Sequence, residues 1–505
     1  MLNSRTIPKL ISASNAIKSL KLRQFSSKTL YEALEPISFL PSVTATIPVK
    51  AKDIKILQQP KDFYKSLIDR IQTAKERIVL SSLYIGESET ELVEVIHNQL
   101  KKNPNLKVDI LLDCLRGTRP SKSGQTSVLS LLPALNEFSD RFSLHLYHTP
   151  DLNGFTKLLI PNRFNEGVGL MHIKGYLIDN DLLLSGANLN NDYFKNRQDR
   201  YYWFNNSNNL SSYFSNLIST INSISYKVTP RSPKDYYLKM TDEKVPDPVN
   251  KSEEFKKLAK SKLSNFLHMT TSESASQLDK LNDDSVDTVV FPTLQMKPLG
   301  IDLDSRVTKG LMSHLNQAGR MVGKGKSAYT NVISTSYFNL DPMYLDSILN
   351  TSGQFNVLTS APEANGFYTS KGVSNLLPDG YTLSETQFLQ TCKRNNKLSK
   401  IKLFEYKKDD WTFHAKGWWI FEPQSNAPFL TWIGSPNYNY RSVHRDLEFQ
   451  SMLVTTNEDL QYEMKKELDQ ILDHCNRVDE DVLSSEEREP RLMAKILFPM
   501  VKTML

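Results

Sequence analysis

Apolar residues along the chain follow two patterns, and both patterns occur twice. Short apolar runs typical of buried strands surround segments with the spacing of an amphipathic helix, first between residues 77 and 188 and again between residues 331 and 437. The predicted strands are RIVLSSLYIG (77–86), LKVDILLDCLRG (106–117) and FSLHLYHTP (142–150), then NVISTSYFNL (331–340), FNVLTSAP (355–362) and IKLFEYKK (401–408), with helices at 89–102 and 342–352. Alternating strands and helices predict an α/β fold, and the repeated order predicts an internal duplication.

A polar segment separates the two halves. Residues 229–287 are rich in charged residues and proline. They contain no run typical of a strand, and only residues 252–268 have the pattern of a helix. We therefore expect an N-terminal domain at 32–228, a linker at 229–287 and a C-terminal domain at 288–505. Duplicated domains of this size commonly pack as a pseudo-dimer, so one cleft shared between equivalent loops is expected.

The last part of each repeat carries the candidate chemistry. MHIKGYLIDNDLLLSGAN (171–188) and FHAKGWWIFEPQSNAPFLTWIGSPN (413–437) each contain His-x-Lys, an apolar run and a small-residue turn that ends in asparagine. On a strand, His172 and Lys174 project to one face, and so do His414 and Lys416. A single His-x-Lys is typical of a half-exposed strand, but two matched copies indicate a site for a phosphate group.

The repeated pattern His-x-Lys-x4-Asp, followed by Gly-Ser-x-Asn, resembles the phospholipase D superfamily. The first copy has Gly-Ala in place of Gly-Ser, and in the second copy Phe421 stands where the aspartate belongs, with Glu422 beside it. The resemblance implies two phospholipase D-like α/β/α domains. It implies catalytic roles for His172, Lys174, Asp179, His414 and Lys416, phosphate binding by Asn188, Asn437 and Ser435, and orientation of a histidine by Glu448.

The acids that follow each turn leave alternatives open. Asp199, Asp446 and Glu448 are each able to orient an imidazole, or to form surface ion pairs with neighbouring arginines. Glu448 is preferred because RDLE keeps the trailing acid of the superfamily, whereas Tyr202 stands at the matching offset from Asp199.

The surrounding sequence, including SLYIG, PEANGF and IGSPNYNYRSVHRDLEFQ, resembles the mitochondrial phosphatidylglycerophosphate synthases. This resemblance implies transfer of a phosphatidyl group from CDP-diacylglycerol to glycerol 3-phosphate, with His172 as nucleophile, His414 as general acid and base, and no cofactor or metal. Arg116, Arg119 and Lys371 are candidates for the glycerol 3-phosphate contact. Alternatives are a cardiolipin or phosphatidylserine synthase, a hydrolytic phosphodiesterase, or a degenerate lipid-binding scaffold.

Charge and composition narrow the partners and the compartment. The net charge is +6, and residues 1–31 contain six Lys or Arg and no acid, which is typical of a mitochondrial presequence. Apolar runs are too short to span a bilayer, so peripheral contact with the inner membrane is expected. The C-terminal segment 491–505 suits either a membrane surface or a terminal helix docked on the core. GRMVGKGKS (319–327) lacks the leading glycine of a P-loop, no aromatic-rich basic strip predicts nucleic-acid binding, and the oligomeric state is left open.

Overall fold

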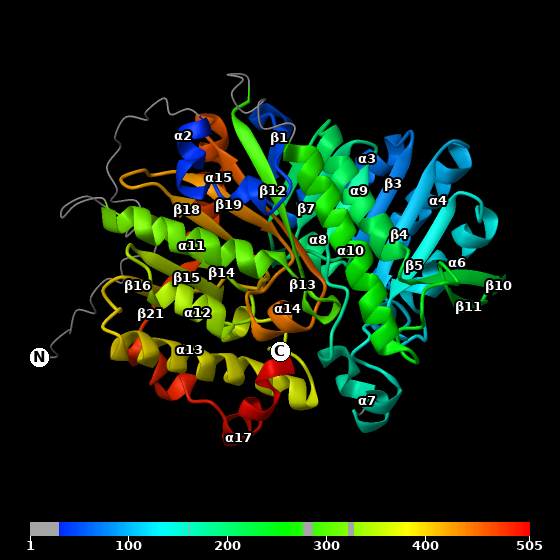
Figure 1. Cartoon of the computed structure of the whole chain (residues 1–505). Coiled ribbons are helices and arrows are strands. Elements are labelled where there is room, and N and C mark those ends of the chain that lie inside the picture. Colours follow the sequence, from blue (N-terminus) through cyan, green and yellow to red (C-terminus); the bar gives the residue numbers. More distant parts are fainter. Residues whose placement is uncertain (1–29, 161, 276–285, 322–327, 505) are drawn as a thin grey trace, which may run out of the picture.

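Two large mixed sheets lie side by side in the chain, with helices packed against both (Figure 1). The computed structural model describes residues 30–160, 162–275, 286–321 and 328–504. The presequence expected at residues 1–31 falls outside these ranges except for its last two residues. Within the described ranges, no helix has both the length and the apolar character to cross a membrane.

The first sheet has the order β11-β10-β5-β4-β3-β6-β7-β9-β2. Strands β3, β4 and β5 run parallel to one another, whereas β6 pairs antiparallel with β3 and forms a hairpin with β7. The strands are β2 (Ile54–Leu57), β3 (Arg77–Ser82), β4 (Lys107–Asp113), β5 (Phe142–Tyr147), β6 (Gly175–Ile178), β7 (Asp181–Ser185), β9 (Tyr201–Phe204), β10 (Tyr226–Ser232) and β11 (Asp235–Met240).

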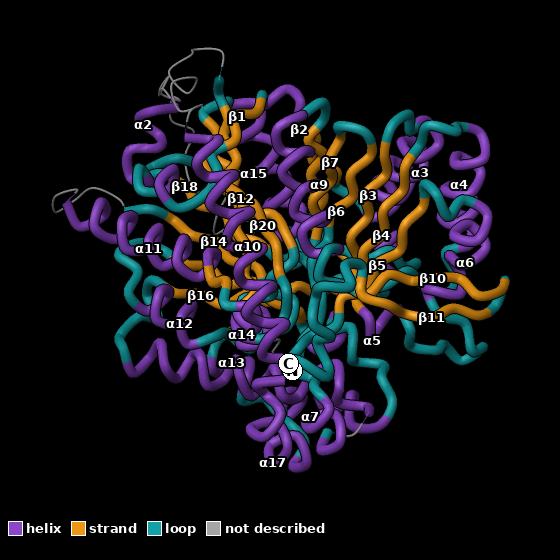
Figure 2. Tube along the Cα trace, turned by 45° about the vertical axis from the view of Figure 1, so that its right-hand side comes forward, coloured by secondary structure: helices purple, strands orange, loops and turns teal. Residues whose placement is uncertain are grey.

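The second sheet has the order β1-β12-β20-β19-β18-β14-β15-β16-β21. Read from the β21 edge, this order repeats that of the first sheet from β10 to β2. Its strands β14, β15 and β16 are parallel, and β18 pairs antiparallel with β14 and forms a hairpin with β19. The strands are β1 (Ile47–Val49), β12 (Thr288–Met296), β14 (Thr330–Ser334), β15 (Phe355–Ser360), β16 (Ile401–Tyr406), β18 (Gly417–Phe421), β19 (Pro428–Gly434), β20 (Glu448–Thr455) and β21 (Cys475–Val478). The matching pattern confirms the duplicated α/β fold (Figure 2).

Helices cover both faces of each sheet, because each helix has one apolar face to bury. On the first sheet, α3 (Pro60–Thr73), α4 (Thr90–Lys102) and α6 (Ser127–Glu137) contribute to one core, and α9 (Asn208–Asn222) to another. On the second, α11 (Leu303–Met321), α12 (Pro342–Leu349) and α13 (Leu377–Arg394) cover one face, and α15 (Glu458–Leu472) the other. The remaining α-helices are α2 (Leu30–Leu34), α5 (Cys114–Gly117), α7 (Gly154–Leu159), α8 (Asp192–Lys195), α10 (Ser252–Ala275), α14 (Tyr440–His444), α16 (Glu480–Leu483) and α17 (Leu492–Val501).

The segment predicted as a polar linker contains more structure than its pattern indicates. The expected helix is present as α10, and it extends seven residues past the predicted end at residue 268. The absence of strands there was a wrong prediction, because β10 and β11 form a hairpin at the edge of the first sheet. Their half-exposed residues lack the apolar alternation that marks a more buried strand.

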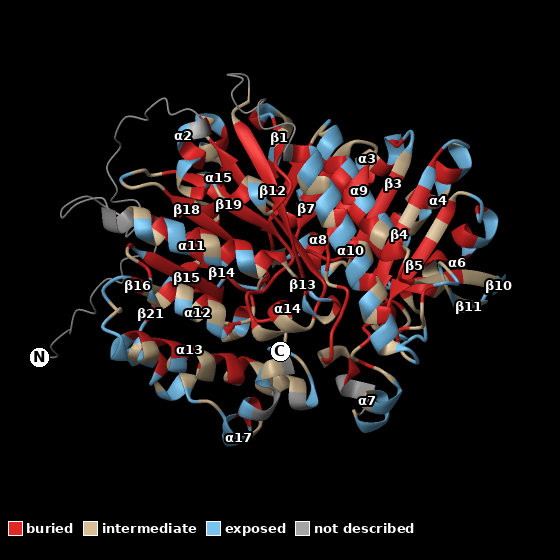
Figure 3. Ribbon diagram, viewed as in Figure 1, coloured by how far each residue is buried: buried red, intermediate tan, exposed pale blue. Residues whose placement is uncertain are grey.

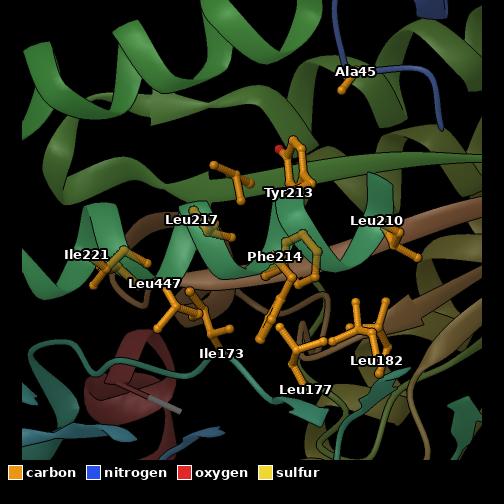
Figure 4. Close-up of a cluster of buried hydrophobic side chains, with 14 of the residues drawn as sticks. Ala45, Ile173, Leu177, Leu182, Leu210, Tyr213, Phe214, Leu217, Ile221 and Leu447 are labelled. Carbon is orange, nitrogen blue, oxygen red and sulfur yellow. The ribbon is translucent and has the colours of Figure 1, made fainter. Parts of the chain in front are cut away.

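One hydrophobic core joins the two halves. It combines α9 and α10 with strands β6 and β7 of the first sheet and with β19 and β20 of the second. Figure 4 shows Ile173 beside Leu177 and Leu447 within this cluster, beneath Phe214 of α9. Figure 3 shows most strands of both sheets buried, except for the edge hairpin of β10 and β11, and many exposed residues on the outer faces of the helices. The core therefore fixes the relative position of the two motif segments.

Candidate active site

Both His-x-Lys segments lie in extended chain just before the first strand of a hairpin. His172 and Lys174 precede β6, and His414 and Lys416 precede β18. Alternation along extended chain sends Ile173 into the shared core, so its two neighbours project to the opposite side. The backbone of His172 donates to the carbonyl of Leu447, which ties this segment to the other half of the chain.

His172 is held by an acid from the second half. Its Nδ1 lies 3.0 Å from both carboxylate oxygens of Glu448, a residue with no exposed surface. The hydroxyl of Ser442 donates to the same carboxylate at 2.8 Å. Because a carboxylate only accepts, Nδ1 carries the proton and Nε2 keeps its lone pair. His172 also lines the cleft between the halves, so Nε2 is the nitrogen available for chemistry.

His414 is held by an acid from the first half. Its Nδ1 lies 2.6 Å from Oδ2 of Asp199, and its Nε2 lies 3.3 Å from the hydroxyl of Tyr193. Asp199 is buried and its second oxygen accepts the backbone N–H of Arg200. The two halves thus exchange carboxylates, each acid orienting the histidine of the other half. Sequence comparison between the copies ranked Asp199 below Glu448, because the exchange is visible only when the halves are packed together.

The two motif lysines are buried beside these pairs. Lys174 donates to the carbonyl of His172 at 2.7 Å, and Lys416 donates to the carbonyl of His414 at 2.6 Å. Nζ of Lys416 also lies 2.7 Å from Nδ1 and 3.2 Å from Nε2 of the His414 ring. Burial lowers the pKa of Lys174 well below its usual value, although Glu448 opposes the effect. Burial also lowers the pKa of Lys416 to about 8, against the attraction of Asp199. Burial therefore disfavours the charged form of both lysines, and an incoming anion would favour it.

Burial disfavours charge on the remaining titratable groups as well. It lowers the pKa of both His172 and His414 well below the usual range, and the neighbouring lysines add to the effect. It raises the pKa of Glu448 to about 7 and that of Asp199 to about 6, while the lysines oppose the rise. Both imidazoles are therefore neutral near pH 7, as a nucleophile or a general base requires.

The three predicted phosphate-binding residues occupy two kinds of position. Asn188 and Asn437 line the cleft, and Oδ1 of Asn437 is buried without a hydrogen-bond partner in the described part of the chain. Ser435 instead faces β20, where its hydroxyl donates to the carbonyl of Phe449 at 3.1 Å. Ser435 also lowers the pKa of Glu448 and so opposes the effect of burial. The asparagines are in place to contact substrate, and Ser435 supports the acid behind His172.

Asp179 lies apart from the other motif residues. It sits in the turn between β6 and β7 with φ = 51°, and its carboxylate accepts the backbone N–H groups of residues 75–77. Five residues of extended chain separate it from Lys174, about 16 Å at 3.3 Å per residue. At the equivalent place Phe421 is buried among apolar residues of the second half. Asp179 therefore stabilises the end of strand β6. The second copy of the motif can have Phe421 at this position because the residue does not contact the histidines.

The cleft between the halves has a volume of about 880 Å³ and a cationic lining. Its lining contains five basic residues and only two acidic ones. The basic residues are Arg116, Arg119, Arg197, Lys371 and Arg441, and the acidic residues are Glu166 and Asp446. Four tyrosines form much of the remaining wall, namely Tyr84, Tyr193, Tyr337 and Tyr381. Such a surface suits a substrate with several negative charges.

One acidic group beside His172 has the composition of a metal site. His172, Asp446 and Glu448 place potential ligand atoms within 4.8 Å of one another. The oxygens of Asp446 already accept from Arg441 at 2.8 and 3.1 Å, and Oδ1 accepts from the backbone of Leu170. Lys174 and Lys416 add positive charge next to Glu448. The acids are thus neutralised by protein cations, which makes the trio a poor site for a further cation.

Comparison with known proteins gives close relatives across most of the chain. The chain is 38% identical over 470 residues to "Probable CDP-diacylglycerol--glycerol-3-phosphate 3-phosphatidyltransferase" of Dictyostelium discoideum, covering 91% of this chain and 78% of the relative. It is 34% identical over 493 residues to the mitochondrial CDP-diacylglycerol–glycerol-3-phosphate 3-phosphatidyltransferase of Homo sapiens, covering 93% and 86%. No family model matches the sequence.

Among solved structures, the phosphatidylserine synthase of Haemophilus influenzae superposes with a TM-score of 0.65 over 94% of this chain and all of that one, at 19% sequence identity. This similarity establishes the shared fold.

Proposed function

The chain belongs to the CDP-diacylglycerol–glycerol-3-phosphate 3-phosphatidyltransferase family, and from this membership we propose that it converts CDP-diacylglycerol and glycerol 3-phosphate into phosphatidylglycerophosphate and CMP. The observation that carries the proposal is the pair of neutral histidines at one cationic cleft, each held by a carboxylate from the opposite half. A double displacement needs one imidazole to attack phosphorus and another to move a proton.

In the first step, Nε2 of His172 attacks the phosphorus that carries diacylglycerol. A nitrogen–phosphorus bond forms, the bond from phosphorus to the CMP oxygen breaks, and CMP leaves with that electron pair. Attack makes the imidazole cationic, and Glu448 at 3.0 Å from Nδ1 stabilises the new charge. Lys174, Lys416 and the cleft asparagines supply the field for the phosphoryl oxygens, so no metal is required.

In the second step, His414 acts as the base. Its Nε2 accepts the proton of the sn-1 hydroxyl as that oxygen attacks phosphorus, and the bond from phosphorus to His172 breaks. Asp199 stabilises the imidazolium that results, at 2.6 Å from Nδ1. Water in place of the alcohol would make the same chain a hydrolase, so acceptor binding decides the outcome.

The acceptor phosphate fits best near Arg116 and Arg119. Both guanidinium groups converge on Glu166, at 3.1 and 2.9 Å, and both also line a side pocket of about 480 Å³ that adds Lys122. A doubly charged phosphate pairs well with two converging guanidinium groups. Lys371 stands singly on the lining of the cleft and makes a weaker candidate.

Two assays test this assignment. CDP-diacylglycerol labelled with ³²P in the phosphatidyl group is supplied with glycerol 3-phosphate, serine, phosphatidylglycerol or water, without metal, and CMP release and lipid products are measured. Product with glycerol 3-phosphate alone supports the proposal, whereas turnover only with water overturns it. Arg119→Ala is expected to raise KM for glycerol 3-phosphate more than Lys371→Ala does, and to leave turnover with glycerol, which lacks the phosphate, unchanged.

The compartment follows from the same relatives. The Homo sapiens relative is named as mitochondrial, and the basic, acid-free residues 1–31 suit import into that organelle. We propose that the enzyme works in mitochondria at the surface of the inner membrane. Its lipid substrate requires contact with a bilayer, which raises the question of the surface that makes the contact.

A further inference from the structure

Exposed apolar side chains gather on two short helices at one end of the molecule. Ten large hydrophobic residues are exposed in the described part of the chain, and six of them lie on α7 and α17. They are Phe155, Leu158 and Leu159 on α7, and Leu492, Met493 and Ile496 on α17. Figures 1 and 2 both place these helices at the same end of the molecule, although one comes from each half of the chain.

Helix α7 presents its apolar residues without burying any. Phe155 is 72% exposed and Leu158 is 86% exposed, and no residue of the helix is buried. Its shape is nevertheless defined, because the side chain of Asn153 caps the backbone N–H of Thr156. A soluble helix ordinarily turns its apolar face to a core, but α7 has no such packing partner among the residues that the structure describes.

Helix α17 is anchored by one face and exposes apolar residues on another. Ala494 and Phe498 are buried, and the ring of Phe498 meets Tyr381 of α13 at 6.3 Å between centroids. Leu492 and Ile496 remain 71% and 54% exposed. The sequence left open whether this segment docks on the core or on a membrane. In the structure, one face of α17 packs on the core and another face remains exposed.

Both helices connect directly to the walls of the cleft. Tyr381, on which α17 packs, lines the cleft. Glu166, which also lines it, follows α7 in the short helix Asn162–Gly167. The apolar surface therefore flanks the cavity into which the lipid headgroup must enter.

The charges beside these residues suit an anionic surface. Lys157 on α7 and Lys502 just after α17 are exposed and have no ion-pair partner among the residues that the structure describes. Arg491 and Lys495 are paired with Asp379 and Glu489. Two exposed lysines without an ion-pair partner in the described part of the chain thus flank the apolar cluster, and lysines beside apolar side chains favour insertion at an anionic lipid interface.

We propose that α7 and α17 form a two-helix membrane-docking surface that seats the cleft on an anionic bilayer. The six apolar side chains enter the headgroup region, and the flanking lysines face anionic lipids. The proposal rests on the proposed function only in that a lipid substrate brings the cleft to a membrane. A second copy of the chain and a protein partner are the competing occupants of this surface.

Flotation with vesicles tests the docking surface separately from catalysis. Full-length protein is mixed with vesicles of phosphatidylcholine and cardiolipin, and the membrane-bound fraction is measured. One variant carries Phe155→Ser, Leu158→Ser and Leu159→Ser, and a second carries Leu492→Ser, Met493→Ser and Ile496→Ser. The matched control carries Met269→Ser and Tyr462→Ser, two exposed residues on α10 and α15.

Each docking variant is expected to bind vesicles at least about tenfold more weakly, while the control binds like the wild type. Turnover of CDP-diacylglycerol in vesicles falls in parallel, but turnover of a short-chain analogue in detergent is unchanged. Vesicle binding equal to that of the wild type in both variants overturns the proposal. So does sedimentation showing that the substitutions dissociate a dimer while vesicle binding persists. Wild-type protein that binds vesicles but makes no product refutes the proposed function and leaves the docking surface standing.

Discussion

Asp199→Asn removes the carboxylate behind His414 with little change in shape. An asparagine oxygen still accepts the backbone N–H of Arg200, so the main hydrogen bond lost is the one to Nδ1 of His414, 2.6 Å in the wild type. The substitution also removes a negative charge that raises the pKa of Lys416. Hydrogen bonds to charged groups contribute about 1.5–3 kcal/mol. At 1.36 kcal/mol per tenfold in rate, turnover is expected to fall by about 10- to 150-fold.

The assay separates the two steps of the reaction. With labelled CDP-diacylglycerol and no acceptor, the variant should form the covalent adduct at nearly the rate of the wild type, because CMP is a good leaving group. With glycerol 3-phosphate, discharge of the adduct should be slow. Glu448→Gln is the matched control and should slow adduct formation instead. Full turnover by Asp199→Asn would refute the reasoning, as would adduct formation slowed as much as in Glu448→Gln.

Three further results follow from the site. Asp179→Ala should lower the free energy of unfolding by about 1–3 kcal/mol, because the backbone N–H groups of residues 75–77 lose their acceptor. Turnover per folded molecule should persist. Chemical denaturation measures the first effect, and the activity of the soluble fraction measures the second. Gly186→Ala should abolish turnover in folded protein, since a Cβ there would lie 2.8 Å from Oδ1 of Asp199 and 2.9 Å from Cδ of Lys416; retained activity with unchanged circular dichroism would contradict this. EDTA treatment should leave turnover unchanged, and a loss restored by a divalent cation would show that a metal takes part.

The sequence predicted the parts of the fold that depend on local pattern. Buried strands such as β4 and β15 are marked by apolar runs in the sequence. The duplicated order of strands and helices followed from these runs. The hairpin of β10 and β11 was missed because its residues are half exposed and carry no alternation. Local pattern also failed to show that β1 joins the sheet of the second half, because pairing between Ile47 and Val290 is a long-range contact.

The site residues show the same difference between local pattern and long-range contacts. The motif indicated both histidines, which line one cleft, and both lysines, which are buried beside them. It also grouped Asp179 with them, since adjacency in a motif does not reveal that a strand separates two residues in space. It ranked Asp199 low for the converse reason. That aspartate acts on His414, which lies 215 residues away in the chain, and the exchange of acids between halves is a property of their packing.

Burial sets the pH range in which the site works. Glu448 has a pKa raised to about 7, so adduct formation should rise with pH through that value as the carboxylate ionises. Lys416 has a pKa lowered to about 8, so the rate should fall above it as the ammonium is lost. The measured profile of single-turnover adduct formation should be bell-shaped with limbs near these values, and Glu448→Gln should remove the acid limb. A rate that stays constant from pH 6 to about 9 would refute this account.

The free energy of unfolding should fall with rising pH over the range in which the activity rises. Because the pKa of Glu448 is raised from 4.5 to about 7 on folding, the folded chain binds its proton more tightly than the unfolded chain does. The stabilisation from this group is complete below pH 4.5 and is lost as the pH rises through 7. Ionisation of Glu448 therefore activates His172 while it destabilises the fold, and Glu448→Gln should flatten the dependence of unfolding free energy on pH between 4.5 and 7. An unchanged dependence in that variant would show that other groups govern the stability of the site.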